Sequence, residues 1–434
     1  MVFLGFTWPL VFVYSRVIKE IRSEIGKVNN GRPTILALQP GRFRGDLEIL
    51  AESGAFRIMV IPNDYLGRIL SLYWNDKISR KKYHNPDGDE RIIQIQKQVR
   101  VFFRKFLPLL YRRLQIDCII EAGAHYKQGY DWRLVSYELG VPCIVLHKEC
   151  LLTNTAHERR FVEVFGKLEK FKGSYMVVHS QITKNIFIRS GYVNPERIDA
   201  LGCLRMDDYV KKVKKIKRLN KKRKKVTLFS FNHCAGLIGL INDFSRNRDV
   251  GYVNLFENVH VCIAKLAMER DDVDFIITPK WAGPWKDEID YVCAKNSINL
   301  SNIRNLSILV DVNVHDVIFE SDVVCGYGST VLLEAAIAAK PVIMPYFDEA
   351  LNPEYSDYIQ FSDTFHIFDV AHSIEEFRQL VTNRLDNQQI SQECMKERYA
   401  VFEKYVSSMK GNAKEQYIGL IKKIVKESKW SHNL

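Results

Sequence analysis

The chain has 434 residues, of which 47% are hydrophobic and 26% are charged. This length and composition exclude a largely disordered protein and predict two domains, each large enough to bury its own core. The formal net charge of +12 suits nucleic acid, an anionic lipid surface or a phosphorylated substrate, and the total charge does not distinguish these partners.

The nine cysteines are scattered singly along the chain, and no CxxC pair occurs. This distribution predicts reduced thiols in a cytoplasmic protein and argues against a disulfide framework or a zinc site. No compact set of His and Asp residues has the spacing of metal ligands, so we expect no bound metal and no other cofactor.

Residues 1–30 form an apolar and aromatic segment that turns basic. Residues 1–14 read MVFLGFTWPLVFVY, and Arg16, Lys19, Arg22 and Lys27 follow. The apolar run is shorter than the about 20 residues of a membrane span, and it lacks the features of a signal peptide. An aromatic run followed by basic residues predicts an interfacial membrane anchor. A buried first helix that covers the domain is the alternative.

Residues 31–210 show the alternation of strands and helices that is typical of an α/β sheet. A polar loop, QPGRFRGD, follows the first strand, and its spacing is not that of the GxGxxG dinucleotide fingerprint. Within this half, residues 98–115 form a basic and apolar helix that suits either an anionic lipid surface or a half-buried position with a solvated basic edge. The predicted strands are 34–38, 57–61, 118–121, 141–146, 175–179 and 197–201.

Three side chains near strand ends of this half are candidates for a general base. Asp46 follows the first strand, and His147 and Glu149 follow the strand at 141–146. Ligands of α/β domains gather at the carboxyl ends of strands, and a base is needed to deprotonate an attacking hydroxyl. A surface position or a structural hydrogen bond is the alternative for each of them.

Residues 211–225 form a linker dominated by Lys and Arg, and a second set of strands begins at residue 226. The linker contains no aromatic residues, so it lacks the stacking groups of a single-strand binder, and we expect no nucleic-acid partner. Asn232 and His233 lie in the loop after the first strand of this half, where they can face phosphates. The further predicted strands are 273–277, 306–310, 323–325 and 342–344.

The stretch SDVVCGYGSTVLLEAAIAAKPVIMPY, residues 321–346, reads as strand, glycine turn, helix and strand. Gly326 and Gly328 bracket the turn, and Ser329 and Thr330 stand where the helix begins. Such a turn directs backbone N–H groups and the positive end of the helix dipole at an anion, and Glu334 can accept two hydrogen bonds from a sugar diol. An ordinary capped helix with a first-turn glutamate is the alternative.

This stretch resembles the donor-nucleotide segment of GT-B glycosyltransferases and of their relatives, the UDP-sugar 2-epimerases and the CDP-glycerol-type polymer transferases. The resemblance implies that the glycine turn and the Ser/Thr pair hold a diphosphate and that Glu334 binds the ribose hydroxyls. Gly202 and Asp207 match the end of the first domain in the same superfamily. The matching residues of the donor segment are Gly328, Ser329, Thr330, Glu334, Ala335, Ala336, Lys340 and Pro341.

The resemblance extends to two further donor-binding candidates. Lys280 stands where relatives carry a basic residue near the donor, although their KPHP-like form is missing, and a phosphate or base contact is carried over to it. His315 precedes the glycine turn in an order that is similar to CDP-glycerol-type transferases.

The sequence therefore predicts two Rossmann-like domains that face a cleft, in a GT-B-like arrangement. Residues 31–210 form the acceptor domain, residues 226–385 the donor domain and residues 386–434 terminal helices. We expect a glycosyltransferase of surface polysaccharide synthesis that moves a sugar from a nucleotide to a glycan or lipid-linked acceptor, in the cytoplasm or on the inner face of its membrane. The alternatives are a CDP-polyol phosphotransferase, a UDP-sugar 2-epimerase and a non-catalytic basic scaffold.

Overall fold

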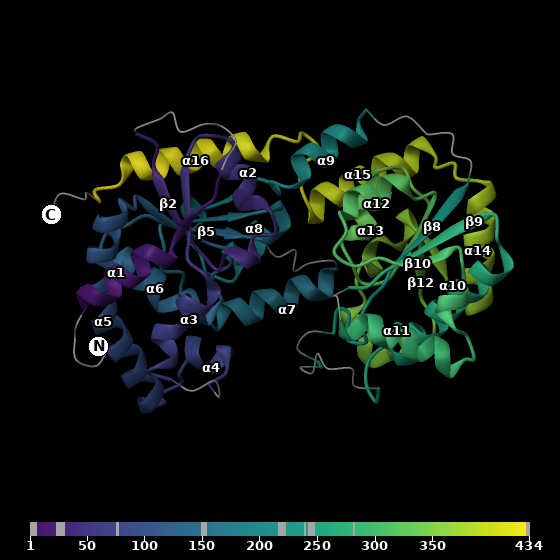
Figure 1. Cartoon of the computed structure of the whole chain (residues 1–434), viewed down its shortest axis with the longest axis horizontal. Coiled ribbons are helices and arrows are strands. Elements are labelled where there is room, and N and C mark those ends of the chain that lie inside the picture. Colours follow the sequence, from purple (N-terminus) through teal and green to yellow (C-terminus); the bar gives the residue numbers. More distant parts are fainter. Residues whose placement is uncertain are drawn as a thin grey trace. The chain divides into compact units, whose positions relative to one another are not determined.

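The computed structural model describes residues 7–22, 31–74, 78–148, 154–215, 223–237, 240–241, 248–280 and 283–430. Glu149, residues 1–6 of the apolar segment and residues 216–222 of the basic linker lie outside these ranges. The chain forms two compact units, each built on its own sheet (Figure 1). The first contains Met1–Cys150, Arg160–Val210 and Lys410–Leu434, and the second contains Leu151–Arg159 and Lys211–Met409.

The sheet of the first unit has the strand order β1-β3-β2-β4-β5-β6-β7 and is parallel except for the β1–β3 pair. Leu38 pairs with Glu121 at the carboxyl ends of β2 and β4. The direction of strand progression reverses between these two strands, so their ends form a topological switch point. The strands are β1 (Lys19–Glu20), β2 (Thr34–Leu38), β3 (Arg57–Val60), β4 (Cys118–Glu121), β5 (Cys143–His147), β6 (Tyr175–Val178) and β7 (Ile198–Ala200).

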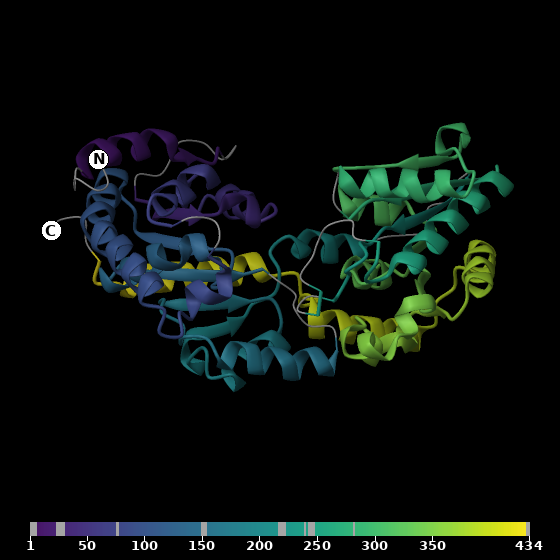
Figure 2. The ribbon, with the colours of Figure 1, turned by 90° about the horizontal axis from the view of Figure 1, so that it is seen from below.

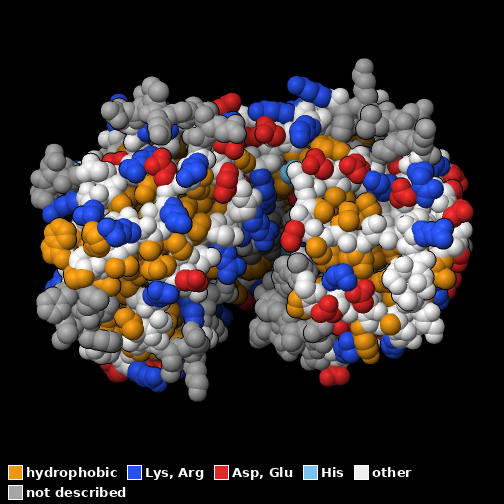
Figure 3. All heavy atoms as spheres, in the orientation of Figure 1, with side chains coloured by type: hydrophobic (Ala, Val, Ile, Leu, Met, Phe, Trp, Pro, Cys, Tyr) orange, Lys and Arg blue, Asp and Glu red, His pale blue; other side chains and the backbone are white. Residues whose placement is uncertain are grey.

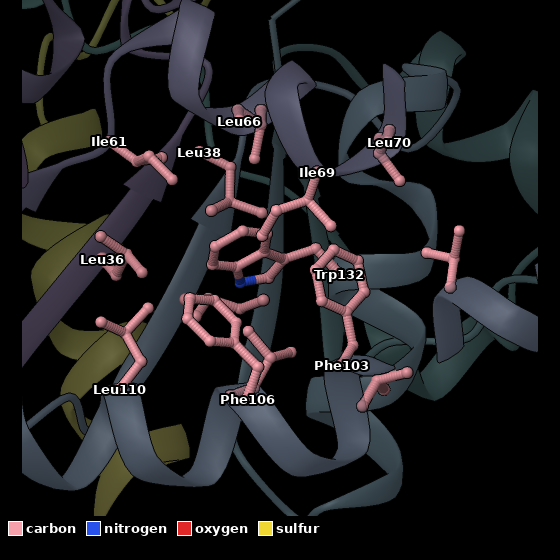
Figure 4. Packing of buried hydrophobic residues seen from close by; sticks show 14 of the residues in the cluster. Leu36, Leu38, Ile61, Leu66, Ile69, Leu70, Phe103, Phe106, Leu110 and Trp132 are labelled. Carbon is pink, nitrogen blue, oxygen red and sulfur yellow. The ribbon is translucent and has the colours of Figure 1, made fainter. Parts of the chain in front are cut away.

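Helices cover both faces of this sheet, because successive side chains of a strand point to opposite faces. Leu36 and Leu38 lie in a core with residues of α1, α3, α5 and α6, at whose centre Figure 4 shows Trp132. Ile35 and Ala37 lie in a second core with residues of α2 and α16. The helices up to residue 213 are α1 (Thr7–Val17), α2 (Asp46–Glu52), α3 (Asn63–Ser71), α4 (Arg80–His84), α5 (Glu90–Leu114), α6 (Lys127–Glu138), α7 (Thr155–Gly166), α8 (Gln181–Arg189) and α9 (Met206–Val213).

The last helix, α16 (Ala413–Glu427), lies along the first unit (Figure 2). The carboxylate of Asp207 accepts hydrogen bonds from the backbone N–H groups of Ala413, at 3.0 Å, and Lys414, at 2.8 Å. The Tyr417 hydroxyl donates to the Gly202 carbonyl at 2.9 Å. Gly202 and Asp207, which the sequence matched to a domain end, therefore hold α16 against the first unit.

The sheet of the second unit is parallel throughout, with the order β10-β9-β8-β11-β12-β13. This is the strand order of the Rossmann fold, and its switch point lies between β8 and β11, where Phe229 pairs with Gly326. The strands are β8 (Lys224–Phe229), β9 (Val273–Thr278), β10 (Leu306–Ile308), β11 (Val323–Gly326), β12 (Val342–Pro345) and β13 (Asp369–Ala371).

The α/β class with two Rossmann-like sheets is confirmed by these two sheets. Every residue of α13 is buried. No helix within the described residues is long and apolar enough to cross a membrane. The remaining α-helices are α10 (Val253–Glu269), α11 (Pro284–Lys295), α12 (Val314–Glu320), α13 (Val331–Ile337), α14 (Ile374–Asp386) and α15 (Gln392–Tyr405).

Candidate functional site

The glycine turn after β11 lies at the switch point of the second sheet. Gly328 has a φ of +59°, in the left-handed region that favours glycine. A Cβ atom at Gly328 would lie 3.1 Å from the Cβ of Ala235, in the loop that follows β8. The absence of a side chain at Gly328 therefore lets the loops of two neighbouring strands approach each other at this point.

The turn presents hydrogen-bond donors and a positive charge. The backbone N–H groups of Gly328, Ser329 and Thr330 donate to no other described residue, and the Ser329 and Thr330 side chains are partly exposed. The Lys280 ammonium lies 3.4 Å from the Ser329 hydroxyl. Successive backbone N–H groups beside a cation form an anion-binding site.

The geometry of this turn weakens the alternative of an ordinary helix cap. Thr330 is the N-cap residue of α13, but its own backbone is helical and its side chain makes no capping hydrogen bond. Because α13 has only seven residues, an anion at this turn would interact mainly with the N–H groups and Lys280, and less with the helix dipole that the sequence suggested.

Glu334 lies in the first turn of α13, and a histidine from the neighbouring helix holds its carboxylate. Its Oε2 atom is 3.2 Å from Nε2 of His315, while its side chain is largely buried. His315 itself is positioned by Asn313, whose side chain accepts from the His315 backbone N–H at 3.0 Å. The structure thus brings Glu334, His315, Lys280 and the turn together from three separate strand ends.

Asn232 and His233 follow β8 at the same edge, but both shape the loop. The Asn232 side chain accepts a hydrogen bond from the Cys234 backbone N–H at 3.0 Å. The His233 imidazole is fully buried, and its ring centroid lies 5.1 Å from the ring centroids of both Phe256 and Trp285. Their predicted contacts with the donor stay predictions, and the burial of the imidazole favours a structural role for His233.

Gln360 is a residue of this edge that the sequence did not identify. Its side chain is partly exposed, and its Oε1 atom lies 3.6 Å from the position that a Cβ at Gly328 would take. Glu349 is bound at the start of α10, where its carboxylate accepts from the backbone N–H groups of Asn254 and Leu255 at 2.8 and 2.9 Å. An irregular loop supplies Gln360, and no periodic pattern marks such a position.

In the first unit, Asp46 is the first residue of α2 and is 5% exposed. Burial raises the pKa of its carboxyl to about 6, while the nearby Arg205 guanidinium, 3.7 Å away, opposes this rise. A carboxyl that titrates near neutral pH is suited to accept a proton from a hydroxyl. The structure therefore gives Asp46 an environment that fits the predicted base.

His147 ends β5 at the carboxyl edge of the first sheet and is fully buried. Its ring centroid lies 5.6 Å from that of His125 and 5.1 Å from that of Phe187. Of the three predicted bases, Asp46 and His147 are thus buried near strand ends. Glu149 lies outside the described residues.

A buried ion pair supports the switch point of the first sheet. Glu121 ends β4, and its Oε2 atom lies 2.5 Å from the Arg133 guanidinium of α6. Burial raises the pKa of Glu121 to about 7, and Arg133 opposes this rise. A Cβ at Gly129 would lie 2.1 Å from Oε1 of Glu121, so only glycine permits this approach. No local sequence pattern pairs Glu121 with Arg133.

Within the described residues, no group of three or more His, Cys, Asp or Glu side chains could hold a metal ion. The eight cysteines that the structure describes are free thiols, and seven of them are buried.

Solved structures share this two-sheet architecture along nearly their whole length. A putative UDP-N-acetylglucosamine 2-epimerase from Listeria monocytogenes is 11% identical, with a TM-score of 0.53 over 92% of this chain and 98% of that chain. The UDP-GlcNAc 2-epimerase from Methanocaldococcus jannaschii is 13% identical, with a TM-score of 0.50 over 90% of this chain and 99% of that one. The chain has a GT-B fold.

This likeness establishes the GT-B fold and leaves the reaction open, because the identities are low. No protein-family model matches the sequence, and the comparison with curated proteins finds no match. In this GT-B chain the second unit carries the glycine turn, Lys280, His315 and Glu334. The function must therefore be argued from these side chains.

Proposed function

We propose that this GT-B chain is a glycosyltransferase that binds a nucleotide-activated sugar in its second unit. The observation that carries the proposal is the set of groups at the β8/β11 switch point. The N–H groups of the glycine turn and the Lys280 ammonium are suited to the diphosphate, and the Glu334 carboxylate, fixed by His315, is suited to the ribose diol. A backbone anion site beside a fixed carboxylate matches the two polar parts of a nucleoside diphosphate.

We propose that the sugar passes to a hydroxyl of a glycan or lipid-linked acceptor bound by the first unit, in surface polysaccharide synthesis in the cytoplasm. The acceptor oxygen attacks the anomeric carbon, the bond to the diphosphate breaks, and the diphosphate leaves with the bonding electrons. Asp46 takes the acceptor proton, with His147 as the second candidate. The N–H groups and Lys280 stabilise the charge on the leaving diphosphate, so the proposal needs no metal and no other cofactor.

A UDP-sugar 2-epimerase is the second candidate, because the solved structures with the same fold named above carry that description. It would use the same nucleotide site without an acceptor. A CDP-polyol phosphotransferase would need a CDP-linked alcohol instead. A basic scaffold would need no nucleotide at all, although the net charge of +12 also suits that function.

Calorimetric titration of the full chain with UDP, CMP, CDP, GDP and UDP-GlcNAc tests the nucleotide site. We expect saturable binding of at least one of these ligands, and binding of none of them would refute the proposal and favour the scaffold. NMR spectra of UDP-GlcNAc incubated with the protein then separate the enzymes. A new sugar stereoisomer without added acceptor identifies an epimerase, whereas release of UDP only with an acceptor identifies a transferase.

Replacing Asp46 by Asn should lower kcat/KM of transfer by about 100-fold or more, because general-base catalysis typically contributes that much. The base acts when it is deprotonated. The rate of the wild-type protein should therefore fall as the pH drops below about 6, the raised pKa of Asp46, and the Asn variant should lose this dependence. Initial rates from pH 5 to 8 measure both effects.

The matched control is Asp199→Asn, since Asp199 is a partly exposed carboxylate of the same unit that accepts from Tyr175 at 2.7 Å. The control should keep the wild-type rate and pH profile. An Asp46→Asn variant with an unchanged profile would show that another group is the base, and His147 would then be tested in the same way.

A further inference from the structure

The first helix of the chain is anchored on one side and leaves aromatic side chains exposed on the other. Val11 and Tyr14 of α1 are buried in the core, and the Tyr14 hydroxyl donates to the Tyr65 carbonyl at 2.7 Å. On the outer side, the exposed fractions are 64% for Trp8, 44% for Phe12 and 41% for Val13. The sequence left open whether this segment is a buried helix or an interfacial anchor. The inner side of α1 fits the buried helix, and its exposed outer side fits the anchor.

Basic side chains surround the exposed aromatic residues. The Arg16 guanidinium lies 4.2 Å from the Phe12 ring centroid, and that of Arg113, from α5, lies 5.5 Å from it. The Arg113 Nε atom also donates to the Ser15 hydroxyl at 2.9 Å, which fixes α5 against α1. Lys19 is exposed just beyond the helix. Figure 3 shows hydrophobic side chains at the left, over α1, with Lys and Arg side chains beside them.

The sequence of α1, TWPLVFVYSRV, contains no acidic residue. Isolated exposed apolar residues are common on protein surfaces. Here, however, three large exposed apolar side chains belong to one short helix, and two guanidinium groups lie close to the ring of Phe12. Aromatic residues with arginines at the edge are the composition of a helix that lies in a membrane interface.

We propose that this surface, formed by Trp8, Phe12, Val13, Arg16 and Arg113, docks on an anionic lipid surface. The three apolar side chains enter the boundary between headgroups and acyl chains, while the guanidinium groups contact lipid phosphates. A second copy of the chain fits this surface less well, because two identical copies would bring their arginine rims together. The proposal is independent of the nucleotide chemistry at the second sheet.

Flotation of the full chain with phosphatidylcholine vesicles, with and without phosphatidylglycerol, tests the proposal. We expect binding only to the vesicles that contain phosphatidylglycerol, and a decrease in binding with added salt. The double variant Trp8→Ser/Phe12→Ser removes the apolar contacts and should bind at least about ten-fold more weakly. The variant Arg16→Glu/Arg113→Glu reverses the charges and should also lose binding.

The matched control is Met268→Ser/Leu351→Ser, since these side chains of the second unit are 62% and 54% exposed. It should bind vesicles as the wild type does, and circular dichroism melting should show that all variants are folded. Equal vesicle binding by the wild type and the Trp8/Phe12 variant would overturn the proposal. The proposal would also be overturned if the wild type bound no vesicles and light scattering showed it to be a dimer that the Trp8/Phe12 variant does not form. That result would identify a second copy of the chain as the occupant.

Discussion

Replacing Glu334 by Ala is expected to weaken nucleotide binding by roughly 100-fold. In the proposed complex a ribose diol donates two hydrogen bonds to this carboxylate. Hydrogen bonds to a charged group contribute about 1.5–3 kcal/mol each, so their loss corresponds to about 3 kcal/mol or more, which is roughly a hundred-fold change in Kd. Calorimetric titration with the best ligand of the nucleotide series measures this change.

Two further variants separate binding from folding. Glu334→Gln keeps the shape of the side chain but replaces one acceptor by a donor, so an intermediate loss of affinity is expected. Glu397→Ala is the matched control, because Glu397 also faces a histidine, with 3.6 Å between its Oε2 and Nε2 of His366, but is exposed on the surface. Equal affinity of Glu334→Ala and Glu397→Ala would contradict the ribose contact.

The sheet strands were largely predictable because buried parallel strands read as continuous apolar runs. The strand at Thr34–Leu38, for example, is buried along its whole length. Two strands were missed. Lys19 and Glu20 of β1 are both exposed, so β1 contains no apolar run. An edge strand such as β1 forms because a neighbouring strand offers hydrogen-bonding partners, and its own sequence carries little signal. The edge strand β13 has three residues, as do the edge strands β7 and β10, which were predicted, so its length alone does not explain why it was missed.

The candidate site was predictable where one local stretch supplies it. Gly328 and Glu334 belong to a single strand, turn and helix, and this local pattern identified them. Lys280 and His315 come from other strand connections, and the resemblance, not periodicity, identified them. The direction of the His233 side chain depends on how α10 and α11 pack around it through Phe256 and Trp285, which no local pattern encodes.

The helix that carries Glu334 depends on a buried arginine that the sequence did not single out. Arg398 of α15 is 2% exposed, and its guanidinium donates to the carbonyls of Ile367, Ala336 and Lys340 at 3.0, 3.3 and 2.8 Å. Ala336 lies in α13 and Lys340 shortly follows it, so Arg398 joins the end of α13 to α15. Because the side chain is buried, the pKa of this guanidinium is lowered from its ordinary value.

Replacing Arg398 by Met should therefore lower the free energy of unfolding of the second unit by about 3–5 kcal/mol. Met retains most of the apolar volume, but it leaves buried carbonyl groups without this donor, and each such loss costs about 1–3 kcal/mol. Urea denaturation, followed by circular dichroism and by tryptophan fluorescence, measures the change. If the two units unfold separately, the unfolding transition of the second unit is the one that added nucleotide shifts to a higher urea concentration, because a ligand stabilises the unit to which it binds. We expect the Arg398→Met variant to lower the midpoint of that transition alone.

The control for this prediction is Arg378→Met, which removes an arginine of the same unit that is paired with Glu269 on the surface, where its side chain is 44% exposed. Exposed ion pairs contribute little to stability, so this variant should unfold nearly as the wild type does. Equal decreases in the free energy of unfolding of the two variants would show that the hydrogen bonds from Arg398 to the three carbonyls do not stabilise the unit. A larger loss in Arg398→Met, accompanied by weaker nucleotide binding, would show that α15 supports the Glu334 carboxylate through the end of α13.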